Sequence, residues 1–222
     1  MKPLAVFDLD GTLVDSRQDL VTSANDMLAS FGASPLREDA IAGFVGDGAK
    51  MLVARSLKAA GVPPGDLGIA LERFLEIYNG RLLETTKPYD GISALIDDAV
   101  DLGVLLGVIT NKPEAPTLKI LDAFNLSMSF GWVIGGDDTR FARKPNPASL
   151  NWMIAQAGAD PSRTLYIGDS EIDADTARAA GTRFCLAAYG FGQARGVVAL
   201  RPGEFSASVA RDVLPVIEGL LS

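Results

Sequence analysis

The chain has 222 residues, and its hydrophobic fraction of 48% with a charged fraction of 22% is typical of a globular protein with a sizeable core. Its formal net charge of −8 argues against a basic nucleic-acid-binding face. It contains one cysteine, Cys185, and no histidine, which excludes an intrachain disulfide, histidine-bound zinc and every mechanism that needs an imidazole in this chain. Any metal bound here must be a hard cation held by oxygen atoms.

The first predicted element is a buried strand at residues 4–7, which ends at two acids spaced one residue apart. From residue 16 to residue 85 the pattern changes to helical, with apolar residues at helical spacing over 20–31, 49–60 and 67–83. Ser16 and Asp19 resemble a capping box at the start of the first helix. The sequence therefore predicts an all-helical segment directly after the first strand.

Beyond residue 86 predicted helices alternate with short apolar strands. Strands are expected at residues 104–110, 132–134, 164–168 and 182–187, with helices near 92–99, 113–124, 147–157 and 173–180. This alternation predicts an α/β fold with a parallel sheet covered on both faces. Residues 1–15 and 86–222 are predicted to form the α/β core. Residues 16–85 are predicted to form a helical cap over the strand ends, where open α/β sheets bind ligands.

Polar residues follow three predicted strands, at the ends that share one edge of a parallel sheet: Asp8-Leu9-Asp10-Gly11-Thr12, Thr110-Asn111 and Gly168-Asp169-Ser170-Glu171-Ile172-Asp173. Lys144-Pro145 opens the helix after the strand at 132–134. We expect these groups to converge on one site. Asp8, Asp10 and Asp169 offer hard oxygen ligands, so Mg²⁺ is the best candidate cofactor, and it also binds phosphate oxygens of a substrate.

With a phosphate ester bound, the residue types predict a division of labour. Asp8 is the candidate nucleophile and Asp10 the candidate general acid and base. Thr110, Asn111 and Lys144 would stabilise the transferring phosphoryl oxygens, with Arg143 as an alternative cation to Lys144. Gly11 would permit a sharp turn, which the Thr12 hydroxyl would fix by a hydrogen bond.

The order of these motifs resembles the four motifs of the haloacid dehalogenase (HAD) superfamily of phosphatases. Within it, the stretches FDLDGTLVDS, VITNKPEAP and LYIGDSEIDADTARAAG are similar to the phosphoglycolate phosphatases. The resemblance implies a Rossmann-like core with an inserted helical cap. It also implies that Asp8 is the nucleophile and a Mg²⁺ ligand, and that Asp10 is the acid/base and binds the metal through its backbone carbonyl. Asp169 would be the third protein ligand, Lys144 would hold nucleophile and phosphate, and Asp173 would orient Lys144 or act through water.

Substrate choice is expected to lie in the cap. The loop Gly46-Asp47-Gly48 is either a substrate-facing loop or a turn at the start of a helix. Lys50 and Arg55 offer positive charge for a substrate carboxylate. The predicted substrate-binding set is Gly11, Thr12, Asn111, Gly46, Gly48 and Lys50.

The resemblance implies Mg²⁺-dependent hydrolysis of 2-phosphoglycolate to glycolate and phosphate through an aspartyl-phosphate. Hydrolysis of another small phosphate ester or of pyrophosphate stays open, as does a binding protein of the same fold without catalysis. Dehalogenases and phosphonatases are disfavoured because they lack the second acid, Asp10. The expected partner is a small anionic phosphate ester, with no nucleic acid, no membrane and a second copy of the chain as a candidate partner. The expected location is the cytosol.

Overall fold

The computed structural model describes residues 2–63, 65 and 67–221. Met1, Pro64, Asp66 and Ser222, which belong to the predicted core and cap, lie outside the described residues. The described strands are β1 (Leu4–Phe7), β2 (Val14–Asp15), β3 (Lys87–Pro88), β4 (Leu105–Ile109), β5 (Trp132–Ile134), β6 (Thr164–Gly168), β7 (Arg183–Ala187) and β8 (Phe205–Ala207). The described α-helices are α1 (Arg17–Ser30), α2 (Glu38–Ala42), α3 (Ala49–Ala59), α4 (Leu67–Gly80), α5 (Ile92–Asp101), α6 (Glu114–Ala123), α7 (Ala148–Ala157), α8 (Glu171–Ala180) and α9 (Leu214–Glu218).

A six-stranded parallel sheet forms the core, with strand order β5-β4-β1-β6-β7-β8. β1 lies inside the sheet between β4 and β6, so Phe7 is in register with both Val108 and Ile167. This central place puts the residues that follow β1 at the middle of the sheet's carboxyl edge.

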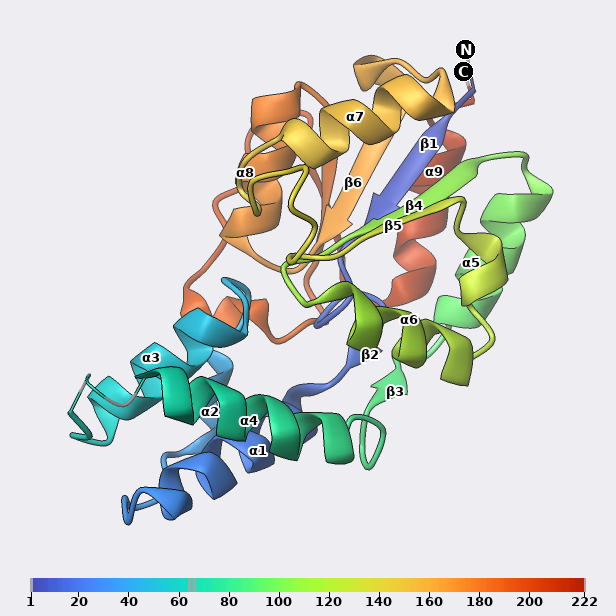
Figure 1. Cartoon of the computed structure of the whole chain (residues 1–222). Coiled ribbons are helices and arrows are strands. Elements are labelled where there is room, and N and C mark those ends of the chain that lie inside the picture. Colours follow the sequence, from blue (N-terminus) through green and yellow to red (C-terminus); the bar gives the residue numbers. More distant parts are fainter. Residues whose placement is uncertain (1, 64, 66, 222) are drawn as a thin grey trace.

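The two faces of the sheet are covered by different helices. Alternate residues of β1 separate between two apolar clusters: Leu4 and Val6 pack with α7 and α8, whereas Ala5 and Phe7 pack with α5, α6 and α9 (Figure 1). Burial on both faces explains why the strands read as continuous apolar runs. The predicted fold class, an α/β parallel sheet with an inserted helical cap, is confirmed.

Helices α1–α4 form a separate group at one end of the sheet (Figure 1), and we call residues 16–85 the helical insert. Short antiparallel strands β2 and β3 pair Val14 with Pro88 and Asp15 with Lys87, where the chain enters and leaves the insert. The ribbon was not predicted because two-residue strands carry no periodic signal. The short helices α2 and α9 and strand β8 were missed for the same reason. No helix among the described residues has the length and apolar character to cross a membrane.

The capping box predicted from Ser16 and Asp19 is wrong. The Ser16 hydroxyl donates a 2.5 Å hydrogen bond to Asp10, and α1 has no side-chain cap. The buried carboxylate of Asp19 instead accepts hydrogen bonds from the backbone amides and hydroxyls of Thr85 and Thr86 at 2.6–3.1 Å. Asp19 therefore joins the start of the insert to its end.

Replacing Asp19 by asparagine is expected to lower the free energy of unfolding at pH 7 by about 2 kcal/mol, since charged hydrogen bonds are lost. Burial opposes the charge of Asp19, but the bonds from Thr85 and Thr86 outweigh it and hold its pKa below the ordinary value. Its stabilisation is therefore present above the unfolded-state pKa of about 3.9 and is lost as the pH falls through the lower folded-state pKa. Urea unfolding at pH 7 and at pH 3 checks this.

The matched control is Asp26→Asn on the same helix. The Asp26 carboxylate is exposed, and its ion pair with the half-buried Arg81 is expected to contribute under about 0.5 kcal/mol. An Asp19→Asn deficit of equal size at pH 7 and pH 3 would contradict this role for the Asp19 charge.

Candidate active site

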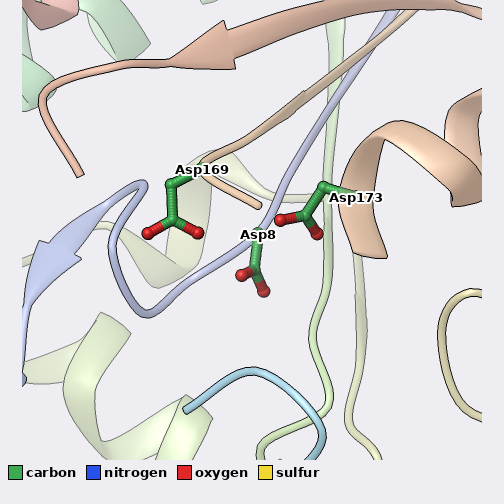
Figure 2. A group of neighbouring side chains, drawn as sticks. All are labelled: Asp8, Asp169 and Asp173. Carbon is green, nitrogen blue, oxygen red and sulfur yellow. The ribbon is translucent and has the colours of Figure 1, made fainter. Parts of the chain in front are cut away.

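Three buried carboxylates from distant parts of the sequence converge at the carboxyl edge of the sheet. Asp8 follows β1, Asp169 follows β6, and Asp173 lies in the first turn of α8 (Figure 2). One carboxylate oxygen from each lies within 4.8 Å of the others. Hard oxygen atoms gathered in this way suit a divalent cation such as Mg²⁺.

The protonation behaviour of this cluster reflects its burial. Desolvation raises the pKa of Asp8 to about 6, with further increases from Asp173 and Asp10 and an opposing effect of Lys144. Desolvation and the charges of Asp173 and Asp8 also raise the pKa of Asp169 well above its ordinary value. The acids repel one another, so a bound cation would favour their ionised forms.

A buried lysine compensates part of this negative charge. Lys144 Nζ lies 2.7 Å from Asp173 and 2.9 Å from Asp8, over the ring of Tyr166. Burial disfavours its ammonium form, but the two carboxylates outweigh burial and raise the pKa of Lys144 well above its ordinary value. Ser170 donates its amide and hydroxyl to the second oxygen of Asp173, which fixes that carboxylate.

One oxygen of the cluster lacks a hydrogen-bond donor. Asp8 Oδ1 is buried and accepts no hydrogen bond from the described residues. The Lys144 ammonium lies 2.9 Å from it in an ion pair, so Lys144 compensates part of its charge.

Glycines allow the chain to close around Asp169. Gly11 has a φ of 86°, and a Cβ there would lie 1.8 Å from the Asp169 carboxylate, so no other residue fits. The amide of Gly192 donates a 2.7 Å hydrogen bond to Asp169 Oδ2. The loop that carries Gly192 thus covers Asp169.

Two predicted roles in the first motif differ from the structure. Thr12 is fully buried, and its hydroxyl has no hydrogen-bond partner among the described residues, so it does not fix the turn as predicted. Backbone bonds from the amides of Thr12, Leu13 and Val14 to the carbonyl of Leu9 hold the turn instead. Neither Gly11 nor Thr12 lines the cavity described below.

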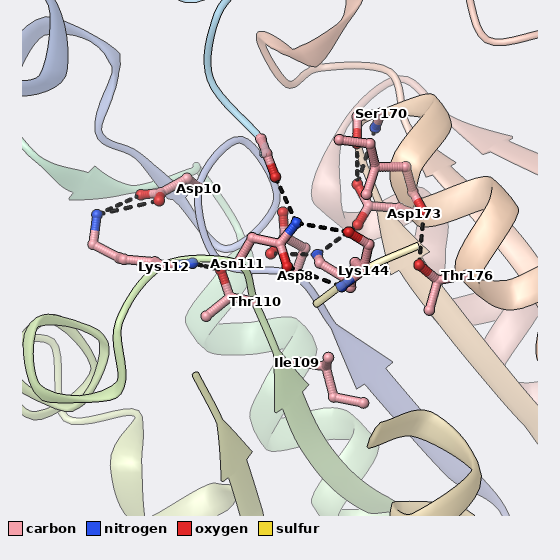
Figure 3. Close-up of polar contacts among 12 residues, drawn as sticks. Asp8, Asp10, Ile109, Thr110, Asn111, Lys112, Lys144, Ser170, Asp173 and Thr176 are labelled. Carbon is pink, nitrogen blue, oxygen red and sulfur yellow. Dashed lines mark hydrogen bonds and ion pairs between the residues drawn. The ribbon is translucent and has the colours of Figure 1, made fainter. Parts of the chain in front are cut away.

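Asp10 points away from the acid cluster. Both its oxygens lie 3.1 Å from Nζ of Lys112, which follows β4 (Figure 3). Lys112 also hydrogen-bonds the hydroxyl of Tyr78 from α4. Its carboxylate is therefore absent from the cluster, and only its backbone carbonyl is left as the predicted metal ligand. Lys112, Tyr78 and Ser170 were missed in sequence, although Lys112 and Ser170 directly follow predicted site residues at strand ends.

Thr110 and Asn111 are both buried beside Asp8. The Asn111 amide donates to the carbonyls of Gly46 at 2.8 Å and Lys144 at 3.1 Å, and its oxygen accepts from the Lys144 amide at 3.0 Å. These bonds use both amide hydrogens, so the structure does not support the predicted phosphate contact from Asn111. Asn111 instead joins the insert to the core. The Thr110 hydroxyl accepts a hydrogen bond from the Lys112 amide, which leaves its own hydrogen for a ligand.

A cavity of about 60 Å³ lies between the core and the insert. Asp8, Asp10 and Asp169 line it from the core, together with Thr110 and Asn111; Gly46 and Gly48 line it from the insert. Lys50 is exposed and is not among the lining residues, and Arg143 is also exposed. Lys144 lies behind Asp8 rather than at the cavity surface.

The structure combines a parallel α/β core, a helical insert and a cluster of buried acids that could hold a divalent cation beside a buried lysine. The chain belongs to the haloacid dehalogenase-like hydrolase family, whose sequence profile matches residues 5–187. It is 37% identical over 217 residues to phosphoglycolate phosphatase 1 of Pseudomonas aeruginosa, which covers 96% of this chain and 78% of that protein.

A second related sequence and a solved structure show the same similarity. Phosphoglycolate phosphatase of Agrobacterium fabrum is 35% identical over 193 residues, which is 86% of this chain and 82% of that protein. The crystal structure of a predicted phosphoglycolate phosphatase from Haemophilus somnus superposes with a TM-score of 0.90 at 26% identity and covers 97% of both chains.

Proposed function

We propose that this protein is a Mg²⁺-dependent phosphomonoesterase that hydrolyses 2-phosphoglycolate to glycolate and phosphate. The observation that carries the proposal is the cluster of three buried carboxylates, Asp8, Asp169 and Asp173, beside a cavity that Asp8, Asp10 and Asp169 line. Relatives named phosphoglycolate phosphatase at 35–37% identity support this substrate.

The donor set fits Mg²⁺. Asp8 and Asp169 would hold the ion with carboxylate oxygens and Asp10 with its backbone carbonyl, while Asp173 stays on Lys144 and Ser170. The mutual repulsion of these buried acids favours such a ligand. When bound, Mg²⁺ would neutralise charge on the phosphate oxygens and on these acids.

The chain's own residues then carry out two successive displacements at phosphorus. An Asp8 oxygen attacks phosphorus while the bond to the ester oxygen breaks, and Asp10 donates a proton to that oxygen as glycolate leaves. Asp10 next removes a proton from water, which attacks phosphorus and breaks the bond to Asp8, releasing phosphate. Lys144 holds the nucleophile, and the Thr110 hydroxyl donates to a phosphoryl oxygen.

The cavity carries polar groups from the core and apolar side chains from the insert. We propose that residues 16–85 act as a cap that selects the substrate, over a catalytic core of residues 1–15 and 86–222. Cytosolic location and self-association remain predictions.

The testing experiment measures phosphate release from 2-phosphoglycolate, other small phosphate esters and pyrophosphate, as kcat/KM with Mg²⁺, with EDTA, and with Mg²⁺ restored. The highest value is expected for 2-phosphoglycolate, with activity lost on chelation and regained with Mg²⁺. Preference for another ester would reassign the substrate. No release from any compound would favour a binding protein of this fold.

A further inference from the structure

A second buried lysine faces the insert side of the cavity and has no part in the proposed steps. Lys112 is the only lysine or arginine among the described residues that line the cavity. It is 7% exposed, and it lies on the far side of Asp8 from the Lys144–Asp173 pair (Figure 3). The site thus carries one ammonium at the nucleophile and another on the leaving-group side.

The position of Lys112 is set relative to Asp10. Its Nζ lies 3.1 Å from each Asp10 oxygen. In the proposed reaction Asp10 donates its proton to the ester oxygen, so whatever the leaving group carries beyond that oxygen lies beside Lys112. In 2-phosphoglycolate the carboxylate begins one carbon beyond the ester oxygen, which brings it within reach of the same ammonium.

The three N–H donors of Lys112 are shared between two groups. Two of them bond the two oxygens of the Asp10 carboxylate, and the third bonds the Tyr78 hydroxyl. A substrate carboxylate would take over one of the two bonds to Asp10, which keeps the other and its hydrogen bond from Ser16. The Lys112 ammonium also lies 4.5 Å from the centre of the Tyr78 ring, which stacks on Phe74 of the same helix. These contacts fix the position of the ammonium, so a ligand would meet it already ordered.

The surroundings favour a charged ligand only next to Lys112. The insert lines the cavity with apolar side chains, including Val45, Leu52 and Leu75, and a charge contact is stronger beside such a surface than in water. Asp10 would repel an anionic leaving group. Lys112 offsets that repulsion at the one point where the leaving group passes.

We infer, building on the proposed function, that Lys112 is the residue that selects substrates with a carboxylate beside the phosphoester, and that Tyr78 positions its ammonium. This role replaces the one predicted for Lys50, which is exposed and outside the cavity lining.

The experiment compares kcat/KM for 2-phosphoglycolate and for ethyl phosphate, which has the same chain length and no carboxylate. In Lys112→Met the preference for 2-phosphoglycolate over ethyl phosphate is expected to fall about 10- to 100-fold, the loss of one charged hydrogen bond. Tyr78→Phe is expected to reduce it by a few-fold. Lys119→Met, on the exposed side of α6, is the matched control.

The ratio separates recognition from an effect on Asp10. Loss of the Lys112–Asp10 pair would lower kcat/KM for both substrates by the same factor. Equal decreases in kcat/KM, with an unchanged ratio between the substrates, would therefore overturn the inference. A collapse of the ratio in Lys50→Met but not in Lys112→Met would do the same. Failure of the wild-type protein to hydrolyse 2-phosphoglycolate, by contrast, would refute the proposed function.

Binding gives a readout independent of turnover. In an Asp8→Asn background, calorimetry with Mg²⁺ measures the Kd of 2-phosphoglycolate and of inorganic phosphate. Adding Lys112→Met is expected to raise the Kd of 2-phosphoglycolate about 10-fold or more and the Kd of inorganic phosphate less than about 3-fold. Equal weakening of both, or of neither, would contradict carboxylate recognition, and a melting curve checks that each variant is folded.

Discussion

Replacing Asp8 by asparagine is expected to lower kcat for phosphate release by at least about 10⁴-fold, because the amide cannot attack phosphorus to form the covalent intermediate. The change keeps the shape of a side chain that lies between Lys144 and Asp169, so the fold is expected to persist. Phosphate release from 2-phosphoglycolate at saturating Mg²⁺ measures the effect.

Stability distinguishes loss of the nucleophile from loss of the fold. Burial raises the pKa of Asp8 to about 6, so its ionised form destabilises the folded chain at neutral pH. Asp8→Asn is therefore expected to be at least as stable as the wild type above pH 6, and this advantage should vanish as the pH falls to about 4. Retained turnover in a folded Asp8→Asn protein would refute covalent catalysis by Asp8.

Replacing Lys144 by methionine is expected to lower the free energy of unfolding at pH 7 by about 3–5 kcal/mol, because it leaves buried carboxylates without their cation. Lys144 contacts both Asp8 and Asp173, and all three are buried. Phosphate release should also be lost. Urea unfolding measures the change in stability.

Two further variants test whether the uncompensated buried carboxylates cause this loss of stability. Lys144→Met combined with Asp173→Asn removes one uncompensated charge and is expected to recover part of the lost stability. Lys119→Met, the same substitution at an exposed helix position, should change stability by less than about 0.5 kcal/mol. A Lys144→Met protein within 1 kcal/mol of the wild type would mean that the buried pairs contribute little.

The sequence determined the layer structure and which edge of the sheet carries most of the candidate site residues. Continuous apolar strands alternating with helices specify a parallel sheet, because only strands buried on both faces need that pattern. The acids were found since a parallel sheet brings its strand ends to one edge, so their position on the chain is enough to predict convergence. The sharp turn at Gly11 was also predictable, because it depends on the local backbone conformation that glycine permits.

Side-chain partners were decided by the tertiary structure. Ser16 and Asp19 have the local spacing of a capping box, yet Ser16 bonds Asp10 and Asp19 bonds Thr85 and Thr86. Lys112 appears in sequence as one more polar residue after a strand. Only packing of α4 against the core brings Tyr78 to it and turns it toward Asp10. The spacing of residues in the sequence predicts their positions on a strand or helix. Tertiary packing determines the hydrogen-bond and ion-pair partners of each side chain, and those partners determine its role.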